Sequence, residues 1–180
     1  MLYNQFNKND NSAVTKIPVA YITKQGFKKL FPDATSTFTI NFQVSISNKK
    51  RNARNVIAFI DNHAANTVIL GAHYDHLGYG EDKNALDTGH VIHNGADDNA
   101  SGTAALLAMA KTAVQHPAKR TQMFLWVAAE EQGLLGSAAY VEKPLWPLAK
   151  TAAALNLDAM NFVGITRDMG VQGSERSSLA

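Results

Sequence analysis

The chain has 180 residues, of which 46% are hydrophobic and 18% are charged, a composition typical of one globular domain with a sizeable core. Its formal net charge of +2, without a basic stripe, excludes the electrostatic pattern of a nucleic-acid-binding protein. No cysteine is present and no apolar run reaches the roughly 18 residues of a membrane span, so thiolate metal ligands, disulfides and a membrane-spanning segment are excluded.

The predicted elements describe an α/β fold. We expect an edge strand over 17–22, a short helix over 24–31 begun by Thr23, and a half-buried strand over 36–47 that pairs with 55–61 as an N-terminal antiparallel hairpin. Apolar strands over 67–72, 122–129 and 151–157 then alternate with helices over 101–115 and 134–142. Strands and helices in this order form a mostly parallel central sheet in a three-layer α/β/α sandwich.

Acidic and imidazole side chains come directly after each of the three apolar strands. His73 follows the first strand, Glu130 and Glu131 follow the second, and Asp158 follows the third. The pair Asp97-Asp98 lies just before the first helix of this part. The carboxyl ends of parallel strands meet at one edge of a sheet, so we expect these groups to converge there. Carboxylates that close together repel one another unless cations neutralise them, so the pattern predicts a metal site.

Four motifs in this order resemble the co-catalytic di-zinc aminopeptidase family, which includes bacterial leucyl aminopeptidases, aminopeptidase Y and glutamate carboxypeptidase II. They are Ala72 to Gly78, Asn94 to Gly102, Ala129 to Ser137 and Asn156 to Met160. The resemblance covers about residues 36–170. It implies a zinc-exopeptidase-like fold and a hydrolase, most often an aminopeptidase, that cleaves the N-terminal peptide bond of a peptide or protein with a metal-bridging water. Such enzymes are usually secreted or periplasmic, although this chain carries no export signal.

The resemblance also implies roles for individual residues. His73 and Asp158 would bind one zinc ion, Asp97 would bridge both ions, Glu131 would bind the second, Glu130 would be the general base and acid, and the carboxylate of Asp75 would orient His73. A cis peptide bond is expected between Asp97 and Asp98. Asp98 itself is expected to be an outer hydrogen-bond acceptor or a solvated cap, and Ser101 is expected to cap the helix.

The chain departs from the family at the second zinc ion. That ion takes its last histidine from beyond the final Asp ligand, whereas all six histidines of this chain precede Asp158. We therefore expect two zinc ions in the full enzyme and a second site that lacks its histidine here, with His76 packing or hydrogen-bonding within its loop. Residues 36–180 are expected to be a catalytic domain that is incomplete at its C-terminus. Residues 1–35 are expected to be a remnant of a protease-associated domain.

Two other functions fit the same fold. A glutaminyl cyclase uses it with one zinc ion, and the apparent two-zinc ligand set makes that reading weaker. A receptor-like or structural relative would have lost its metal ligands, and the presence here of His73, Asp97, Glu130, Glu131 and Asp158 argues against it.

Overall fold

The computed structural model describes residues 22–33, 41, 50–80, 85, 91–160 and 170–173, and the chain divides into two units, Met1–Lys49 and Lys50–Ala180. The first unit contains α1 (Lys24–Leu30), as the sequence predicts. Its start is stabilised by Thr23, whose hydroxyl accepts a hydrogen bond from the main-chain amide of Gly26 at 3.1 Å. The predicted strands over 17–22 and 36–47, and with them the hairpin, lie outside the described residues except for residues 22 and 41.

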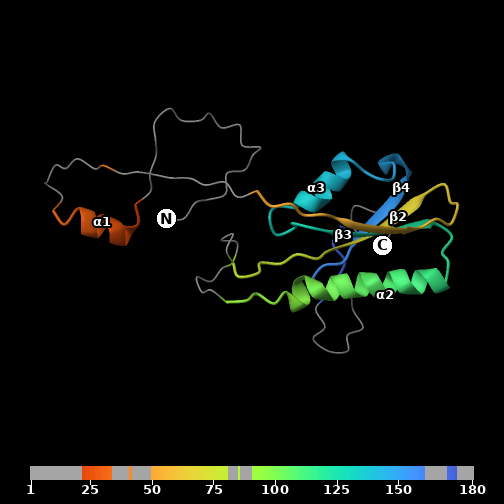
Figure 1. Ribbon diagram of the computed structural model, residues 1–180, viewed down its shortest axis with the longest axis horizontal. Coiled ribbons are helices and arrows are strands. Elements are labelled where there is room, and N and C mark those ends of the chain that lie inside the picture. Colours follow the sequence, from red (N-terminus) through yellow and green to blue (C-terminus); the bar gives the residue numbers. More distant parts are fainter. Residues whose placement is uncertain are drawn as a thin grey trace. The chain divides into compact units, whose positions relative to one another are not determined.

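The second unit is built on a sheet that has four strands in the part of the chain described, in the order β1-β3-β2-β4 (Figure 1). The strands are β1 (Val56–Ile60), β2 (Thr67–His73), β3 (Thr121–Val127) and β4 (Thr151–Asn156). β2 is parallel to both of its neighbours, β3 and β4, whereas β1 pairs with β3 in the antiparallel sense. The α/β class and the mostly parallel sheet are therefore confirmed.

Two helices cover opposite faces of this sheet, α2 (Gly102–Gln115) on one side and α3 (Leu135–Glu142) on the other (Figure 1). Alternate residues of the central strands face the two helices because side chains alternate across a strand. The core on one face contains Ile69, Met123, Leu125, Val127 and Tyr140. The core on the other face contains Leu70, Ala72, Leu106, Ala113 and Phe124. The central strands are buried on both faces, which explains why their sequences are almost continuously apolar.

The register of the parallel strands sets the position of the site. His73 at the end of β2 lies opposite Val127 at the end of β3, and Gly71 lies opposite Asn156 at the end of β4. The residues that follow these three strands therefore emerge at the same edge of the sheet. The irregular helical turn η1 (Ala96–Ser101) leads directly into α2.

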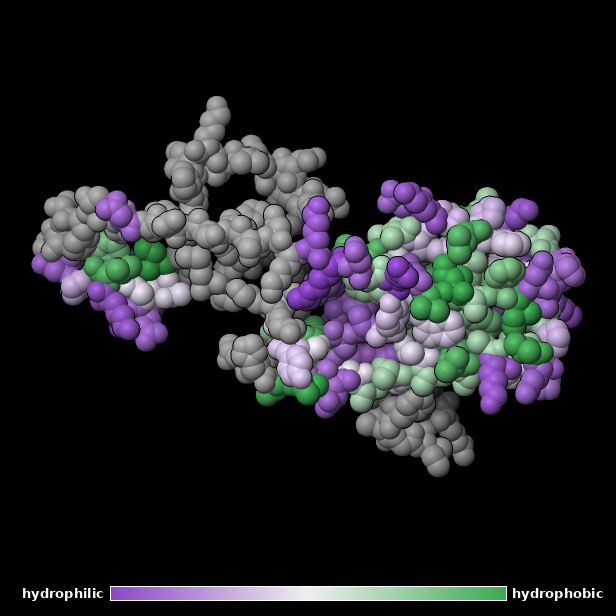
Figure 2. All heavy atoms as spheres, in the orientation of Figure 1, coloured by the Kyte–Doolittle hydropathy of each residue, from purple (hydrophilic) through white to green (hydrophobic). Residues whose placement is uncertain are grey.

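The surface of the second unit is mixed in character. Figure 2 shows hydrophobic side chains beside hydrophilic ones on the face in view, and the exposed large apolar residues include Phe59, Leu107, Val114 and Leu145. Among the described residues, no helix combines the length and the apolar character needed to cross a membrane.

Candidate metal centre

His73 is the buried centre of the strand-end cluster, with 1% of its surface exposed. Its Nδ1 atom lies 3.0 Å from the main-chain carbonyl oxygen of Asp75, to which it donates a hydrogen bond. That hydrogen bond leaves Nε2 to face the carboxylates beyond the sheet edge. The main-chain carbonyl of His73 accepts a hydrogen bond from the hydroxyl of Thr103 at 2.9 Å, which fixes the end of β2 against α2.

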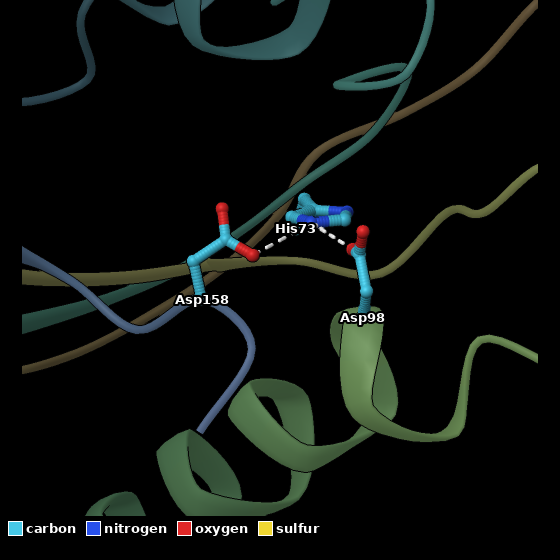
Figure 3. A group of neighbouring side chains, drawn as sticks. All are labelled: His73, Asp98 and Asp158. Atoms are coloured by element: carbon cyan, nitrogen blue, oxygen red, sulfur yellow. Dashed lines mark hydrogen bonds and ion pairs between the residues drawn. The ribbon is translucent and has the colours of Figure 1, made fainter. Parts of the chain in front are cut away.

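Two carboxylates converge on the Nε2 atom of His73 (Figure 3). Oδ1 of Asp98 lies 3.0 Å away, and Oδ1 of Asp158 lies 3.3 Å away. Asp98 comes from η1 at the start of α2, and Asp158 comes from the segment that follows β4. Both are about half exposed, so the group opens toward solvent on the side away from His73.

The acidic residue of η1 that reaches His73 is Asp98, whereas the sequence predicted Asp97 for this position. Neither group of candidate metal ligands among the described residues includes Asp97. The main-chain carbonyl of Asp97 instead accepts a hydrogen bond from the hydroxyl of Ser101 at 2.5 Å. The cis peptide bond is also one residue later than predicted, between Asp98 and Asn99. Residue type alone could not separate two neighbouring aspartates, because the backbone of η1 decides which one faces the strand ends.

Asn99 is the residue that fastens η1 to the sheet, and it was not identified from the sequence. It is 2% exposed, and its side-chain amide donates to the carbonyl of Leu157 at 2.9 Å. Its Oδ1 atom accepts hydrogen bonds from the amides of Gly102 at 3.0 Å and Ala159 at 3.3 Å. Asn99 thus ties the start of α2 to the segment that carries Asp158. An asparagine three residues before a helical amide is a common capping arrangement, and this was the available signal.

Ser101 does not cap α2 in the way the sequence predicted. Its backbone is already helical and its side chain makes no capping hydrogen bond, because Asn99 has taken the amide of Gly102. The hydroxyl of Ser101 instead accepts a hydrogen bond from the amide of Met160 at 3.1 Å. Ser101 therefore adds a second connection between η1 and the segment after β4.

A second group of potential ligands shares Asp98 with the first. Nδ1 of His76 lies 2.7 Å from Oε1 of Glu131 and 3.9 Å from Oδ1 of Asp98. The side chains of His76 and Glu131 are 22% and 17% exposed. Asp98 therefore lies between two imidazole–carboxylate groups, His73 with Asp158 on one side and His76 with Glu131 on the other.

Asp75 is close to His73 as predicted, but it contacts the ring through its main chain. Its Oδ1 atom is 3.9 Å from Nδ1 of His73, too far for a hydrogen bond. The carboxylate instead accepts hydrogen bonds from the amides of Glu130 at 3.0 Å and Glu131 at 3.3 Å. The reason is the position of these amides, which lie in the turn after β3 and face the loop after β2.

The ionisation of His73 and Glu130 reflects this crowding of charge. Burial lowers the pKa of His73, but the hydrogen bond to Asp75 and the negative charges of Asp158, Glu130 and Asp98 together raise it above its ordinary value. Burial raises the pKa of Glu130, and the charge of His73 opposes that rise only in part. The pKa values of both groups are therefore raised, so each side chain holds its proton more tightly than the free group does.

The donor atoms fit a zinc ion. Two atoms bound to a tetrahedral zinc ion at roughly 2.0–2.1 Å lie about 3.3 Å apart. The distances from Nε2 of His73 to Asp98 and Asp158 are 3.0 and 3.3 Å. Imidazole nitrogen and carboxylate oxygen are the ligand types of zinc sites that keep an open position.

Comparison with known proteins shows the family of this chain. Residues 55–180 match Peptidase family M28. An aminopeptidase of Pseudomonas aeruginosa (strain UCBPP-PA14) is 29% identical over 197 residues, which cover 99% of this chain and 34% of that protein. A probable leucine aminopeptidase of Trichophyton verrucosum (strain HKI 0517) is 38% identical over 114 residues, which cover 60% of this chain and 28% of that protein. The chain thus spans about a third of the length of these relatives.

Solved structures show the same fold. A leucine aminopeptidase precursor from Bacteroides thetaiotaomicron aligns with a TM-score of 0.52 and 24% identity over 60% of this chain and 42% of that one. A Zn-dependent exopeptidase from Parabacteroides distasonis aligns with a TM-score of 0.51 and 24% identity over 59% of this chain and 41% of that one. The family match covers well over half of the chain and includes every strand of the sheet and every candidate ligand. The chain therefore belongs to Peptidase family M28.

Proposed function

We propose that this chain is the metal-binding part of a zinc-dependent exopeptidase, most simply an aminopeptidase that hydrolyses the N-terminal peptide bond of a peptide or protein. The observation that carries the proposal is the convergence of Asp98 and Asp158 on Nε2 of His73. The names of its relatives, an aminopeptidase and a leucine aminopeptidase, agree with this activity. We further propose that residues 1–35 are a remnant of a protease-associated domain and that the enzyme acts outside the cytoplasm, both by family resemblance.

The site residues would have distinct roles in metal binding. His73, Asp98 and Asp158 would hold one zinc ion, and Asp98 with Glu131 would hold a second, so Asp98 takes the bridging role first assigned to Asp97. Bound zinc supplies a Lewis acid that makes water a nucleophile near neutral pH and stabilises negative charge on the substrate oxygen.

Glu130 is the proposed general base and acid. It belongs to neither group of candidate ligands, yet the charges of His73, Asp158 and Glu131 influence its pKa, so it lies beside them. Its carboxylate would take a proton from the attacking water and return it to the departing amine nitrogen. Asp75 would position this group, because its carboxylate binds the amide of Glu130.

The test combines metal analysis with three assays on one protein preparation. We expect zinc by elemental analysis and hydrolysis of a leucine or alanine p-nitroanilide, and we expect a chelator to remove both. If a peptide with an N-terminal glutamine cyclises while the leucine and alanine p-nitroanilides remain intact, the protein is instead a glutaminyl cyclase. Release of a C-terminal residue from an N-blocked dipeptide would change the assignment to a carboxypeptidase. A protein that binds no zinc would contradict the proposal altogether.

A further inference from the structure

Asn55 lies directly before β1, at the end of the sheet where β3 finishes, because these two strands are antiparallel. Its side chain is partly buried and binds the main chain on either side of Glu130 and Glu131. We propose that Asn55 is a positioning residue, which holds the turn after β3 so that the two glutamates keep their places beside His73. This inference rests on the proposed function, because that function gives the glutamates their roles.

The carboxamide of Asn55 makes a hydrogen bond to each end of the turn. Its Oδ1 atom accepts from the amide of Ala128, directly after β3, at 3.1 Å. Its Nδ2 atom donates to the carbonyl of Gly136, in the first turn of α3, at 2.7 Å. A carboxamide suits this place because it carries a donor and an acceptor on one planar group. Asn55 therefore fastens both ends of the turn to the start of β1.

The two ends of the turn lie directly against each other. A Cβ atom on Gly136 would be 2.7 Å from the amide nitrogen of Ala128 and 2.6 Å from Oδ1 of Asn55, and it would also meet the carbonyl oxygen of Ala128. These contacts leave no room for a side chain. Glycine at this position therefore permits the approach that brings its own carbonyl within reach of Asn55.

The backbone inside the turn explains why support from outside is needed. Ala129 and Leu134 have φ values of 54° and 59°, in a region that residues with a side chain adopt rarely. Such conformations persist only where the surrounding structure holds them. The carbonyl of Glu130 accepts hydrogen bonds from the amides of Gly133 and Leu134, both at 2.9 Å. The turn is thus wound tightly around Glu130, and Asn55 holds its two ends together.

A movement of this turn would reach the site directly. The amides of Glu130 and Glu131 donate to the carboxylate of Asp75 at 3.0 and 3.3 Å. Asp75 therefore fixes the middle of the turn to the loop after β2, whereas Asn55 fixes its ends to β1. Without Asn55 the turn is free to pivot about its contact with Asp75. A displacement of about 1 Å at reacting groups can lower a rate by about 10²-fold.

Asn62 provides a matched control at the other end of β1. Its Nδ2 atom donates to the main-chain carbonyl of Arg120, just before β3 begins, at 2.8 Å. Asn62 thus makes the same kind of link between the same two strands as Asn55, but at the opposite end from the candidate metal centre. Asn55→Leu and Asn62→Leu should both lower the stability of the fold, and only Asn55→Leu should disturb the site.

The first test is amide hydrogen exchange in the metal-free protein, followed by NMR, because it requires neither zinc nor activity. Compared with Asn62→Leu, Asn55→Leu should accelerate exchange of the Glu130 and Glu131 amides by about tenfold, in addition to any change shared with β2 and β3. Equal exchange of these two amides in both variants would overturn the role of Asn55.

Two further measurements keep this test decisive if the leucine variants do not fold. Asn55→Asp retains the acceptor oxygen and loses the donor, and it is compared with Asn62→Asp in the same way. In wild type, the amide of Ala128 and the side-chain amide of Asn55 should both exchange slowly, and rapid exchange of either would overturn the proposed hydrogen bonds.

Zinc binding and turnover then connect the turn to the proposed function. In Asn55→Leu, zinc affinity should fall by about tenfold and kcat for leucine p-nitroanilide by about 10–100-fold, with KM little changed. Asn62→Leu should match wild type in all three. Faster exchange in Asn55→Leu with unchanged zinc affinity and kcat would overturn the positioning role alone. A wild-type protein that neither binds zinc nor cleaves this substrate would overturn the proposed function, while the exchange result still decides whether Asn55 holds the turn.

Discussion

The carboxylate of Asp75 binds the main-chain amide of Glu130 at 3.0 Å, and through its other oxygen it binds the amide of Glu131 at 3.3 Å. This relationship joins the loop after β2 to the turn after β3. The main-chain carbonyl of Asp75 also accepts a hydrogen bond from the ring of His73. Asp75 therefore holds three site residues in position: His73, Glu130 and Glu131.

Asp75→Ala should therefore affect both stability and metal binding. Two partly buried amides lose a charged acceptor, so we expect the free energy of unfolding to fall by about 2 kcal/mol. Zinc affinity should fall by roughly 10–100-fold, as expected when a hydrogen-bond partner behind metal ligands is lost. Urea denaturation and a competitive zinc titration measure the two effects. Asp75→Asn keeps one acceptor oxygen and should be intermediate; a wild-type value for Asp75→Ala would contradict the role.

Asp97 and Asp98 offer a second comparison, because the same substitution can be made at neighbouring positions. Asp98→Asn removes the carboxylate shared by both ligand groups, so zinc affinity should fall by more than the roughly 10–100-fold that follows from loss of an outer partner. Asp97→Asn should keep zinc affinity within a few-fold of wild type. Equilibrium dialysis against zinc measures both. If Asp97→Asn proves the more damaging change, the assignment from sequence was right after all.

The contrast between these aspartates shows what could be predicted from the sequence. β2 was expected over 67–72 and is found over Thr67–His73, because a continuous apolar run marks a strand buried on both faces. The convergence of His73 and Asp158 also followed from strand order. The choice of Asp98 did not, since it depends on local backbone angles: Gly95 has a φ of +64° and Asp98 has φ −104° and ψ 95°.

The pairing of β1 with β3 could not be predicted for a different reason. The segment 55–61 has the composition of a strand, and the sequence predicts that it pairs with 36–47 in a hairpin, a pairing that lies outside the described residues. The structure pairs β1 with β3, which lies far along the chain: Val56 is opposite Trp126 and Ile60 is opposite Gln122. Nothing in the local pattern of either strand specifies so distant a partner. The contact between His76 and Glu131 likewise depends on the loop after β2 lying next to the turn after β3.

Gly102 should be intolerant of any side chain. A Cβ atom there would lie 2.6 Å from the carbonyl oxygen of Leu157 and would also meet Oδ1 of Asn99, the atom that binds the amide of Gly102. Gly102→Ala should lower the free energy of unfolding by about 1–3 kcal/mol, as overpacking commonly does. Gly170→Ala is the control, because its Cβ would meet nothing within 4 Å. Urea denaturation of the two variants should separate them, and equal stability would contradict the close packing of η1 against the segment after β4.

Glu130→Gln tests the proposed base. The substitution keeps size and leaves the ligands in place, so the zinc content should be unchanged while turnover falls by roughly 10²–10⁴-fold. Glu142→Gln makes the same chemical change at an exposed position at the end of α3 and should leave the rate unaltered. Unaltered turnover in Glu130→Gln would remove Glu130 from the mechanism.

The raised pKa values of Glu130 and His73 predict that the stability of the metal-free protein depends on pH, and Glu130→Gln tests this. Glu130 has a pKa raised above 4.5 in the folded chain, so its ionisation opposes folding: its contribution is fully favourable below the unfolded pKa and is lost as pH rises through the folded pKa. The raised pKa of His73 acts in the same direction at higher pH, since a folded state that holds its proton more tightly loses that advantage as pH rises above 6.5.

With a chelator present, wild type should therefore lose stability as pH rises from about 5 to about 8. Glu130→Gln lacks the first of these losses, so its free energy of unfolding relative to wild type should increase over the lower part of that range. Saturating zinc should reverse the trend, because the ion replaces the proton on Nε2 of His73 and binds more tightly as that proton leaves. If the difference in stability between wild type and Glu130→Gln does not change with pH, the pKa of Glu130 is not raised in the folded protein.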